Sequence, residues 1–414
     1  MIGNTKTRPN ALPKNGQAKA AAQRDKMTAL ERRASSTLAS IYGLRMLGLF
    51  LILPVFALYA RTLPGGANDR LVGLALGIYG LTQAILQIPF GVASDRWGRK
   101  PVMMLGLVIF AAGSFLAGFA HTLPLIILGR AVQGAGAISA AISAMIADAT
   151  REQHRTKAMA RVGMTIGASF VIALIAGPAL YNAIGVPGMF ILTGILAIIA
   201  ILVVKFVVPD VAIHVPAVTA EPRASVFSPA LLRLHFSIFS LNFMQVSMFL
   251  VVPLALVDHA GIPIQHHWMV YLPLAVLGFA IAVPGIIWAE TRGLMRPFLL
   301  AAIALLTVTM LGFAAGYRSE LGLIVALFGF FIAFNLLEAL LPSLVSRTAP
   351  QARKGFAMGV YNTAQSLGLF AGGAIGGLAA TYSDAAVFLV CAALGLVWLG
   401  IAAFIQPPPR RQAG

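Results

Sequence analysis

Long apolar stretches separated by short polar connections dominate this chain of 414 residues. Twelve stretches reach about 20 residues, the length that a helix needs to cross the hydrocarbon core of a bilayer. They lie at residues 39–61, 72–93, 101–120, 123–147, 157–180, 188–208, 231–256, 267–288, 297–316, 321–346, 355–381 and 384–405. Because strands of a membrane barrel would be about half as long and would alternate apolar with polar residues, the pattern predicts twelve transmembrane helices.

The twelve stretches form two groups of six, separated by a segment with four prolines, Pro209, Pro216, Pro222 and Pro229. Dense proline breaks helices and favours extended backbone. The polar connections also repeat: residues 95–101, after the second stretch, resemble residues 290–297, after the eighth, in their order of acid, Gly, base and Pro. The sequence therefore predicts an all-α membrane protein with two pseudo-symmetric six-helix bundles. We expect a cytoplasmic tail at 1–38, bundles at 39–208 and 231–405, a cytoplasmic linker at 209–230 and a tail at 406–414.

Composition agrees with lipid as the main solvent, since 59% of residues are hydrophobic and 10% are charged. The formal net charge of +17 comes from basic residues that gather on one side of the predicted membrane. The opposite side holds only Arg61, Arg70 and Arg318. The positive-inside rule then places both termini in the cytoplasm, and the charge reflects topology rather than a nucleic-acid partner. We expect a multi-pass protein of the inner cell membrane that acts as a monomer.

The connection after the second stretch groups an acid and several bases between glycines, at Gly91, Asp95, Arg96, Gly98, Arg99 and Lys100. A plain loop does not need this grouping, whereas a carboxylate that pairs with Arg can hold two helix ends together. The segment resembles motif A of the major facilitator superfamily at all its polar positions. The resemblance implies a cytoplasmic gate in which Asp95, Arg96 and Arg99 contact Asp148 and the start of the eleventh helix near Gly355 when the inner side is closed.

Other segments fit the drug/proton antiporter group of this family. Arg130, Gln133 and Gly134 in the fourth stretch look like motif B, whose arginine the family associates with proton coupling. Gly177 and Pro178 look like the end of the antiporter motif C, although Ala173 stands where the family usually has glycine. Leu47-Gly48 and Pro54 in the first stretch also fit the group. The stretch Thr150–Met159 resembles the corresponding segment of a proton-driven efflux transporter of the same superfamily.

Two charged residues inside the predicted spans are candidates for proton coupling. Arg130 lies several residues from the end of its span, where an arginine is costly and normally faces a polar interior. Glu338 lies eight residues before Ser346 and is the only carboxylate well within a span. Each has an alternative structural role, as a hydrogen-bonded brace between helices.

Amide and hydroxyl side chains on shared helix faces are candidates for a substrate cavity, although cross-helix hydrogen bonds are an equal alternative. These residues are Gln83, Gln87, Asn242, Gln245, Asn335, Tyr361, Asn362 and Gln365. None of them is charged, and a cavity walled mainly by Phe, Met, Leu and Tyr suits lipophilic solutes better than sugars.

These features predict a secondary active transporter that exports a small amphipathic or drug-like solute in exchange for protons by alternating access. Proton-coupled symport or facilitated transport of a sugar or another metabolite remains the alternative. A membrane enzyme or a receptor is the other class considered, but the spans offer no nucleophile, metal cluster or paired acids at one depth. No phosphate-binding Gly-x-x-x-x-Gly-Lys-Ser/Thr segment is present, so we expect the proton gradient as energy source, without cofactor or metal.

Overall fold

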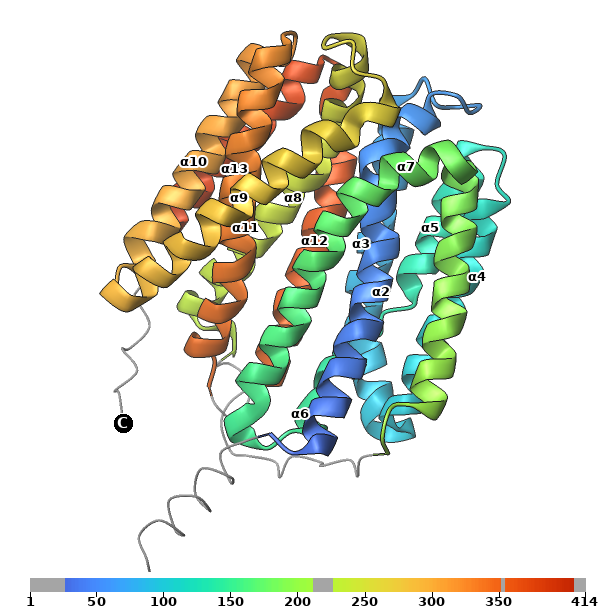
Figure 1. The fold of residues 1–414 in the computed structure, drawn as a ribbon, viewed down its shortest axis with the longest axis vertical. Coiled ribbons are helices and arrows are strands. Elements are labelled where there is room, and N and C mark those ends of the chain that lie inside the picture. The colour runs from blue at the N-terminus through green and yellow to red at the C-terminus, as the bar shows by residue number, and fades with distance from the viewer. Residues whose placement is uncertain (1–26, 211–225, 351–353, 406–414) are drawn as a thin grey trace, which may run out of the picture.

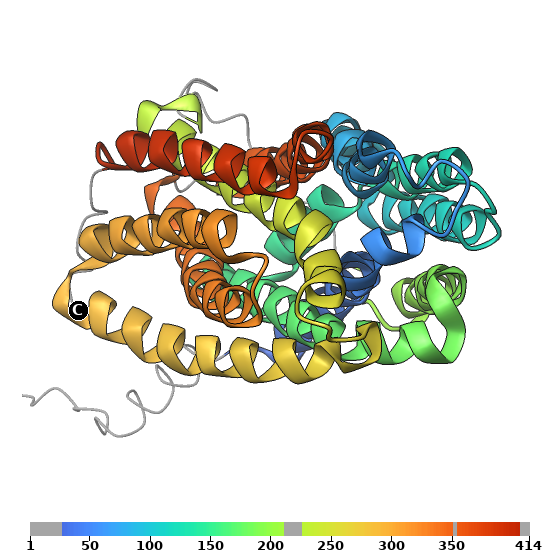
Figure 2. The same ribbon diagram turned by 90° about the horizontal axis from the view of Figure 1, so that it is seen from above.

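The computed structural model describes residues 27–210, 226–350 and 354–405. The helices of the N-terminal half are α2 (Ala29–Ala60), α3 (Asp69–Trp97), α4 (Arg99–Gly118), α5 (Leu123–Ala135), α6 (Ser139–Ala149) and α7 (Glu152–Phe206). Those of the C-terminal half are α8 (Pro229–Asp258), α9 (His267–Arg292), α10 (Met295–Gly316), α11 (Glu320–Thr348), α12 (Lys354–Ala380) and α13 (Asp384–Ala402), with a short 3-10 turn at Ile264–His266. The two halves lie side by side, on the right and left of Figures 1 and 2.

The described helices account for the twelve predicted spans. Ten helical stretches are long and apolar enough to cross a membrane, and one of them is the 55-residue α7. That helix contains two predicted spans, because Gly185 has φ 65° and ψ 174° and reverses the chain just before Pro187. The helix α12 supplies the remaining span. The fold is therefore all-α with twelve spans, as the sequence predicts.

The fourth predicted span, residues 123–147, is not one helix. It breaks between Ala135 and Ser139, where the backbone N–H groups of Ala137 and Ile138 bond locally to the carbonyls of Ala135 and Gly136. The broken segment packs closely on α4, and this approach needs glycine, since a Cβ on Gly136 would overlap the carbonyl oxygen of Gly106 in α4. Non-helical backbone at membrane depth is tolerated where protein buries it, as it does here.

The first helix begins earlier than the predicted boundary at residue 38. Thr28 caps α2 in a reciprocal box with Glu31, whose carboxylate accepts the backbone N–H of Thr28 at 2.7 Å. The same carboxylate binds Arg151, at the start of α7, through Nε at 2.9 Å and Nη2 at 3.0 Å. The N-terminal tail therefore ends before α2, because this buried carboxylate fixes the first turns of α2 against α7. The predicted linker and C-terminal tail lie mainly outside the described residues.

The two halves meet through symmetry-related helix pairs. The helix α3 packs on α12, the first part of α7 packs on α9, and α2 packs on α8. An aromatic cluster joins the halves near mid-membrane, where Phe170 of α7 lies 5.1 Å from Phe50 of α2 and 5.1 Å from Phe334 of α11, measured between ring centroids. Phe249 of α8 completes the cluster at 6.3 Å from Phe170. The core of the molecule is thus shared by both halves.

We predict that Glu31→Gln lowers the free energy of unfolding by about 1–3 kcal/mol, because it removes a charged partner of Arg151, which is half exposed. The hydrogen bonds from Arg151 hold the pKa of Glu31 below its usual range. The stabilisation by Glu31 should be complete well above pH 4, where the carboxylate is ionised in both the folded and the unfolded state. It should decrease below about pH 4 and disappear once both states bind the proton. Thermal unfolding of the purified protein from pH 3 to pH 8 measures this difference.

Glu320→Gln is the matched control, since Glu320 is an exposed carboxylate in the first turn of α11. Its effect should stay below about 1 kcal/mol, the size of a surface helix-dipole interaction. Equal losses in the two variants would contradict a specific role for the contact between Glu31 and Arg151.

Candidate functional site

A polar cluster at the end of the molecule that the sequence predicts to be cytoplasmic is organised around Arg99, at the start of α4. Its Nε donates to Asp148 Oδ2 at 2.9 Å, and its Nη1 donates to Ser94 Oγ at 2.8 Å and also to Asp95. Gly98, with φ 99°, makes the tight reversal between α3 and α4 that brings these groups together. The Arg99 side chain is 8% exposed and that of Asp148 10%, whereas Asp95 is 62% exposed. The structure therefore contains the predicted contact between Arg99 and Asp148.

Two other predicted contacts of this cluster are not formed. Arg96 is exposed and donates no hydrogen bond to Asp148 among the described residues. Gly355 is also exposed, and a Cβ placed on it would meet no atom within 4 Å. Lys100 binds Asp210, at the beginning of the linker, at 2.6 Å. The gate hypothesis also predicts that the contacts of Arg99 break when the inner side opens. In this structure the halves are packed together at the opposite end, and Arg99 nevertheless keeps Asp95 and Asp148, so these contacts join α3, α4 and α6 within the N-terminal half.

The outer ends of the two halves are in direct backbone contact. A Cβ on Gly73 of α3 would overlap the carbonyl oxygen of Gly373 in α12, and one on Gly77 would press on the backbone of Phe370. Nearby, Arg61 donates to Asp258 across the halves at 3.2 Å. At the end that the sequence predicts to be cytoplasmic, Gly163 of α7 and Gly359 of α12 have open space beside them, since a Cβ on either would meet no atom within 4 Å. The halves are therefore packed together at the predicted outer end, and these two glycines have no such contact, which in the predicted orientation agrees with an inward-facing arrangement.

Arg130 of α5 is fully engaged by hydrogen bonds and is 1% exposed. Its Nη1 donates to Gln133 Oε1 at 2.8 Å, and its Nε and Nη2 donate to carbonyl oxygens of Ala75 and Leu76 in α3, both at 3.3 Å. Gln133 in turn donates to Ser114 of α4 at 2.8 Å. Gly134 lets α5 approach α3, since a Cβ there would overlap the Tyr79 carbonyl oxygen. Motif B therefore joins three helices, which favours the bracing role of Arg130 in this state.

The residues that look like motif C serve close packing of α7 on α2. A Cβ on Gly177 would crowd the carbonyl oxygen of Leu51 and the ring of Pro54. Pro178 follows inside the same helix. Gly177 and Pro54 therefore lie at the same depth, at the place where α7 and α2 touch.

Glu338 of α11 lies near the centre of the molecule, on the C-terminal half. Its Oε2 is buried and has no hydrogen-bond partner. Tyr42 of α2 and Tyr361 of α12 lie within electrostatic reach of this carboxyl group. Glu338 therefore interacts electrostatically with one tyrosine of each half.

The predicted cavity residues belong to both halves, on α3, α8, α11 and α12. Gln365 donates to Asn242 Oδ1 at 3.5 Å, and Asn242 donates to the Ile238 carbonyl oxygen at 3.1 Å within its own helix. Gln83 donates to Ser139 at 3.5 Å. Four more of the predicted cavity residues carry buried polar atoms without a hydrogen-bond partner, namely Gln87, Gln245, Asn335 and Tyr361. Burying such atoms without a hydrogen bond costs free energy, so these residues are suited to bind water or the polar groups of a ligand.

Sequence reasoning missed Arg45 as a site residue. This residue of α2 is 2% exposed, and its Nη1 donates to Ser139 Oγ, at the start of α6, at 2.9 Å. The sequence could have indicated it, because Arg45, like Arg130, is an arginine that lies several residues inside a predicted span.

We predict that Gly373→Val opens the outer side, because its side chain would collide with the backbone of α3. Spin labels on Arg61→Cys and Asp258→Cys should then move apart in pulsed electron paramagnetic resonance distance distributions. The native Cys391 is buried, so labelling at these exposed positions is selective.

Gly359→Val is the matched control, since it adds the same side chain to the same helix in open space. Its label distances should equal those of the parent. A similar shift for both substitutions, or none for Gly373→Val, would contradict the assignment of this glycine contact as the outer closure.

We also predict that Arg130→Ala lowers thermal stability by an amount equivalent to about 2–4 kcal/mol, because it leaves a cavity, removes the hydrogen bonds to α3 and leaves Gln133 Oε1 without its donor. Arg233→Ala provides the comparison, since that half-buried arginine makes one side-chain hydrogen bond, to the Phe404 carbonyl oxygen, and lies over the Phe404 ring. A melting temperature of Arg130→Ala equal to that of the parent would contradict the bracing role of Arg130.

Comparisons with known proteins agree with this architecture. The family described as Major Facilitator Superfamily matches residues 38–373 and 296–414. The inner membrane transport protein YajR of Escherichia coli (strain K12) is 44% identical over 397 residues, covering 93% of this chain and 86% of that protein. The quinolone resistance protein NorA of Staphylococcus aureus (strain MSSA476) is 25% identical over 354 residues, covering 80% of this chain and 86% of NorA.

Among solved structures, a bacterial homologue of the human lysosomal transporter Spinster, in an inward-facing and occupied conformation, superposes with a TM-score of 0.70. It is 13% identical and covers 94% of this chain and 100% of its own, so it shows the shared fold. The family match, the identity to YajR and the two six-helix halves lead to one conclusion: the chain belongs to the major facilitator superfamily of membrane transporters.

Proposed function

We propose that this transporter exports a small amphipathic or drug-like solute in exchange for protons that enter through the same central region. The observation that carries the proposal is Glu338, a carboxylate well within the described spans whose Oε2 is buried without a partner. A group that must take up and release a proton during each cycle cannot be permanently engaged in an ion pair. No ion pair holds Glu338 among the described residues.

The position of Glu338 suits coupling between proton and solute. Tyr42 and Tyr361 place hydroxyl groups from opposite halves near the carboxyl group. A change in the charge of Glu338 therefore acts where the two halves meet, and this is the contact that alternating access must rearrange. Arg130 is the second candidate for coupling, through its effect on the local field, and it stays a prediction beside its bracing role.

The cavity chemistry supports an amphipathic solute. The aromatic cluster of Phe50, Phe170, Phe249 and Phe334 supplies apolar, polarizable side chains where the two halves meet. Aromatic walls with a few polar groups are typical of sites for drug-sized ligands. Similarity to NorA, a quinolone resistance protein, points in the same direction.

The proposal also includes the membrane topology, the oligomeric state and the energy source of the transporter. Both termini lie in the cytoplasm of a cell with an inner membrane, as the distribution of basic residues indicates. The transporter works as a monomer in the bilayer, is driven by the proton gradient and needs no cofactor. Symport or facilitated transport of a sugar or another metabolite is the alternative, and the direction of solute movement relative to protons distinguishes it.

We predict that Glu338→Gln keeps solute exchange in proteoliposomes but abolishes accumulation driven by a proton gradient, because the amide keeps the shape and cannot titrate. Counterflow of a labelled solute from a compound panel measures exchange, and an imposed pH gradient measures accumulation. Glu320→Gln, at the exposed outer end of the same helix, should behave as the parent in both assays. Undiminished gradient-driven accumulation by Glu338→Gln would remove this residue from the coupling mechanism.

A further inference from the structure

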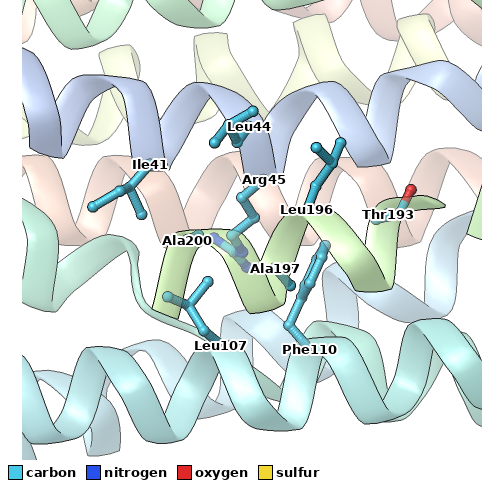
Figure 3. A pocket seen from close by; sticks show the side chains of 9 residues that line it. All are labelled: Ile41, Leu44, Arg45, Leu107, Phe110, Thr193, Leu196, Ala197 and Ala200. Carbon is cyan, nitrogen blue, oxygen red and sulfur yellow. The ribbon is translucent and has the colours of Figure 1, made fainter. Parts of the chain in front are cut away.

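The arginines of this structure have two kinds of surroundings. Arg45 is 2% exposed, and Figure 3 shows it among side chains that include Leu107 and Phe110. Arg233 of α8 and Arg296 of α10 lie instead near the first turns of their helices, where Arg233 is half-buried and Arg296 is exposed. The protein therefore encloses Arg45, whereas the second pair is open to a partner from outside.

Arg233 and Arg296 converge on the C-terminal end of α13. Arg233 Nη1 donates to the carbonyl oxygen of Phe404 at 2.8 Å, and Arg296 Nη2 donates to that of Ala403 at 2.5 Å. Because consecutive Cα atoms lie about 3.8 Å apart, these bonds make the two guanidinium groups close neighbours. An arginine has five N–H donors, so one side-chain hydrogen bond to the described residues leaves most of them for another partner.

The protein does not balance the positive charge of this pair. The carbonyl groups at the end of a helix carry about half a negative charge, whereas each arginine carries a full positive charge. Neither arginine forms an ion pair in the described part of the chain. The acidic residues of α8 and α13, Asp258 and Asp384, lie at the opposite ends of these helices, and α10 has none. The pair therefore keeps an excess of positive charge.

The depth of the pair corresponds to the lipid headgroups. Arg233 is the third residue of the predicted span 231–256, and Arg296 directly precedes the span 297–316. Phe404 is next to last in the span 384–405. Three spans thus place a boundary of the hydrocarbon core at this level, on the side that the sequence predicts to be cytoplasmic.

Exposed apolar side chains flank the two arginines. Phe404 is 69% exposed, and the centroid of its ring lies 5.9 Å from Arg233 Cζ. Leu232, next to Arg233, is 48% exposed. Basic groups at the headgroup level with apolar side chains beside them suit a molecule that has both a negative headgroup and hydrocarbon chains.

We propose that Arg233 and Arg296 form a binding site for an anionic phospholipid. Its phosphate group bridges the two guanidinium groups, and its acyl chains lie against Leu232 and Phe404. The lipid thereby connects the ends of α8, α10 and α13 on the surface of the C-terminal half. The inference concerns lipid binding alone and does not depend on the direction or the energy source of transport.

The first test measures the melting temperature of the purified full-length protein in neutral detergent. Phosphatidylglycerol, phosphatidylcholine and soluble glycerol phosphate are added separately at equal concentration and equal ionic strength. We expect phosphatidylglycerol to raise the melting temperature saturably by about 1–3 °C more than phosphatidylcholine, as ligand linkage predicts, and glycerol phosphate to have no effect. Equal shifts with the two phospholipids would overturn the proposal. A shift with glycerol phosphate as large as that with phosphatidylglycerol would assign the site to a soluble anion and contradict the lipid.

Variants assign the effect to the arginine pair. Arg233→Gln and Arg296→Gln should each weaken the retention of phosphatidylglycerol in native mass spectrometry about fivefold, because each removes one basic residue from the headgroup. The double variant should lose less than the product of the two single effects, since both arginines contact one phosphate group. A loss equal to that product would contradict a shared headgroup, and parental retention in the double variant would place the lipid elsewhere.

Arg292→Gln is the matched control, since it removes an exposed arginine at the end of α9, four residues before Arg296. Arg292 lies over the ring of Trp288 in its own helix, at 5.4 Å, and α9 packs mainly on α11 and α7 rather than on α13. Its retention of phosphatidylglycerol should stay within about twofold of the parent. Equal losses for Arg292→Gln and the two site variants would indicate general attraction to a basic surface and overturn the site.

Lysine variants decide the question if a glutamine variant fails to fold. Arg233→Lys and Arg296→Lys keep the charge and a donor for the carbonyl groups after α13, but lysine lacks the paired donors that fit a phosphate group. Each should lower the retention of phosphatidylglycerol about twofold or more, whereas Arg292→Lys should not change it. Parental retention in both site variants would contradict the binding of the phosphate between the two guanidinium groups.

Discussion

The absence of water from the bilayer interior is the constraint on which this structure depends. Every buried polar group has to find its partner within the protein, so charged residues are few inside the spans and each has a distinct environment. Arg130 illustrates the satisfied case, with acceptors from α3 and α5 for each of its three nitrogens. Glu338 and Arg45 illustrate the opposite case, with buried atoms that lack partners. In a transporter, such unsatisfied groups mark the places where protons or ligands can act.

Glycine determines how closely the helices approach, and thereby which face of the transporter is closed. The ridge of glycines on α12 meets two neighbours: Gly368 and Gly372 contact the backbone of α8, while Gly373 and Gly377 contact that of α3. The first contact lies within the C-terminal half and the second joins the two halves. One helix can therefore remain fixed in its own bundle while its other face separates from α3 during the transport cycle.

Charges are distributed unequally between the two halves. The interior of the N-terminal half contains Arg45 and Arg130, and that of the C-terminal half contains Glu338. The first two are packed among helices of their own bundle, while Glu338 faces the contact between the bundles. The arginines and the carboxylate are therefore kept in different parts of the molecule, and no ion pair joins them among the described residues.

The sequence alone determined the twelve spans, the division into two bundles and the residues of the cytoplasmic cluster, because these depend on local hydrophobicity and on short motifs. It also identified Glu338, since depth within a span can be counted along one helix. Tertiary structure decided the rest: the break before Ser139, the early start of α2 fixed by Arg151, the packed outer glycines and the unpaired edge of Arg45. Each of these depends on contacts between residues far apart in the chain, such as Gly73 with Gly373, and no local pattern records which distant backbone will lie against a given residue.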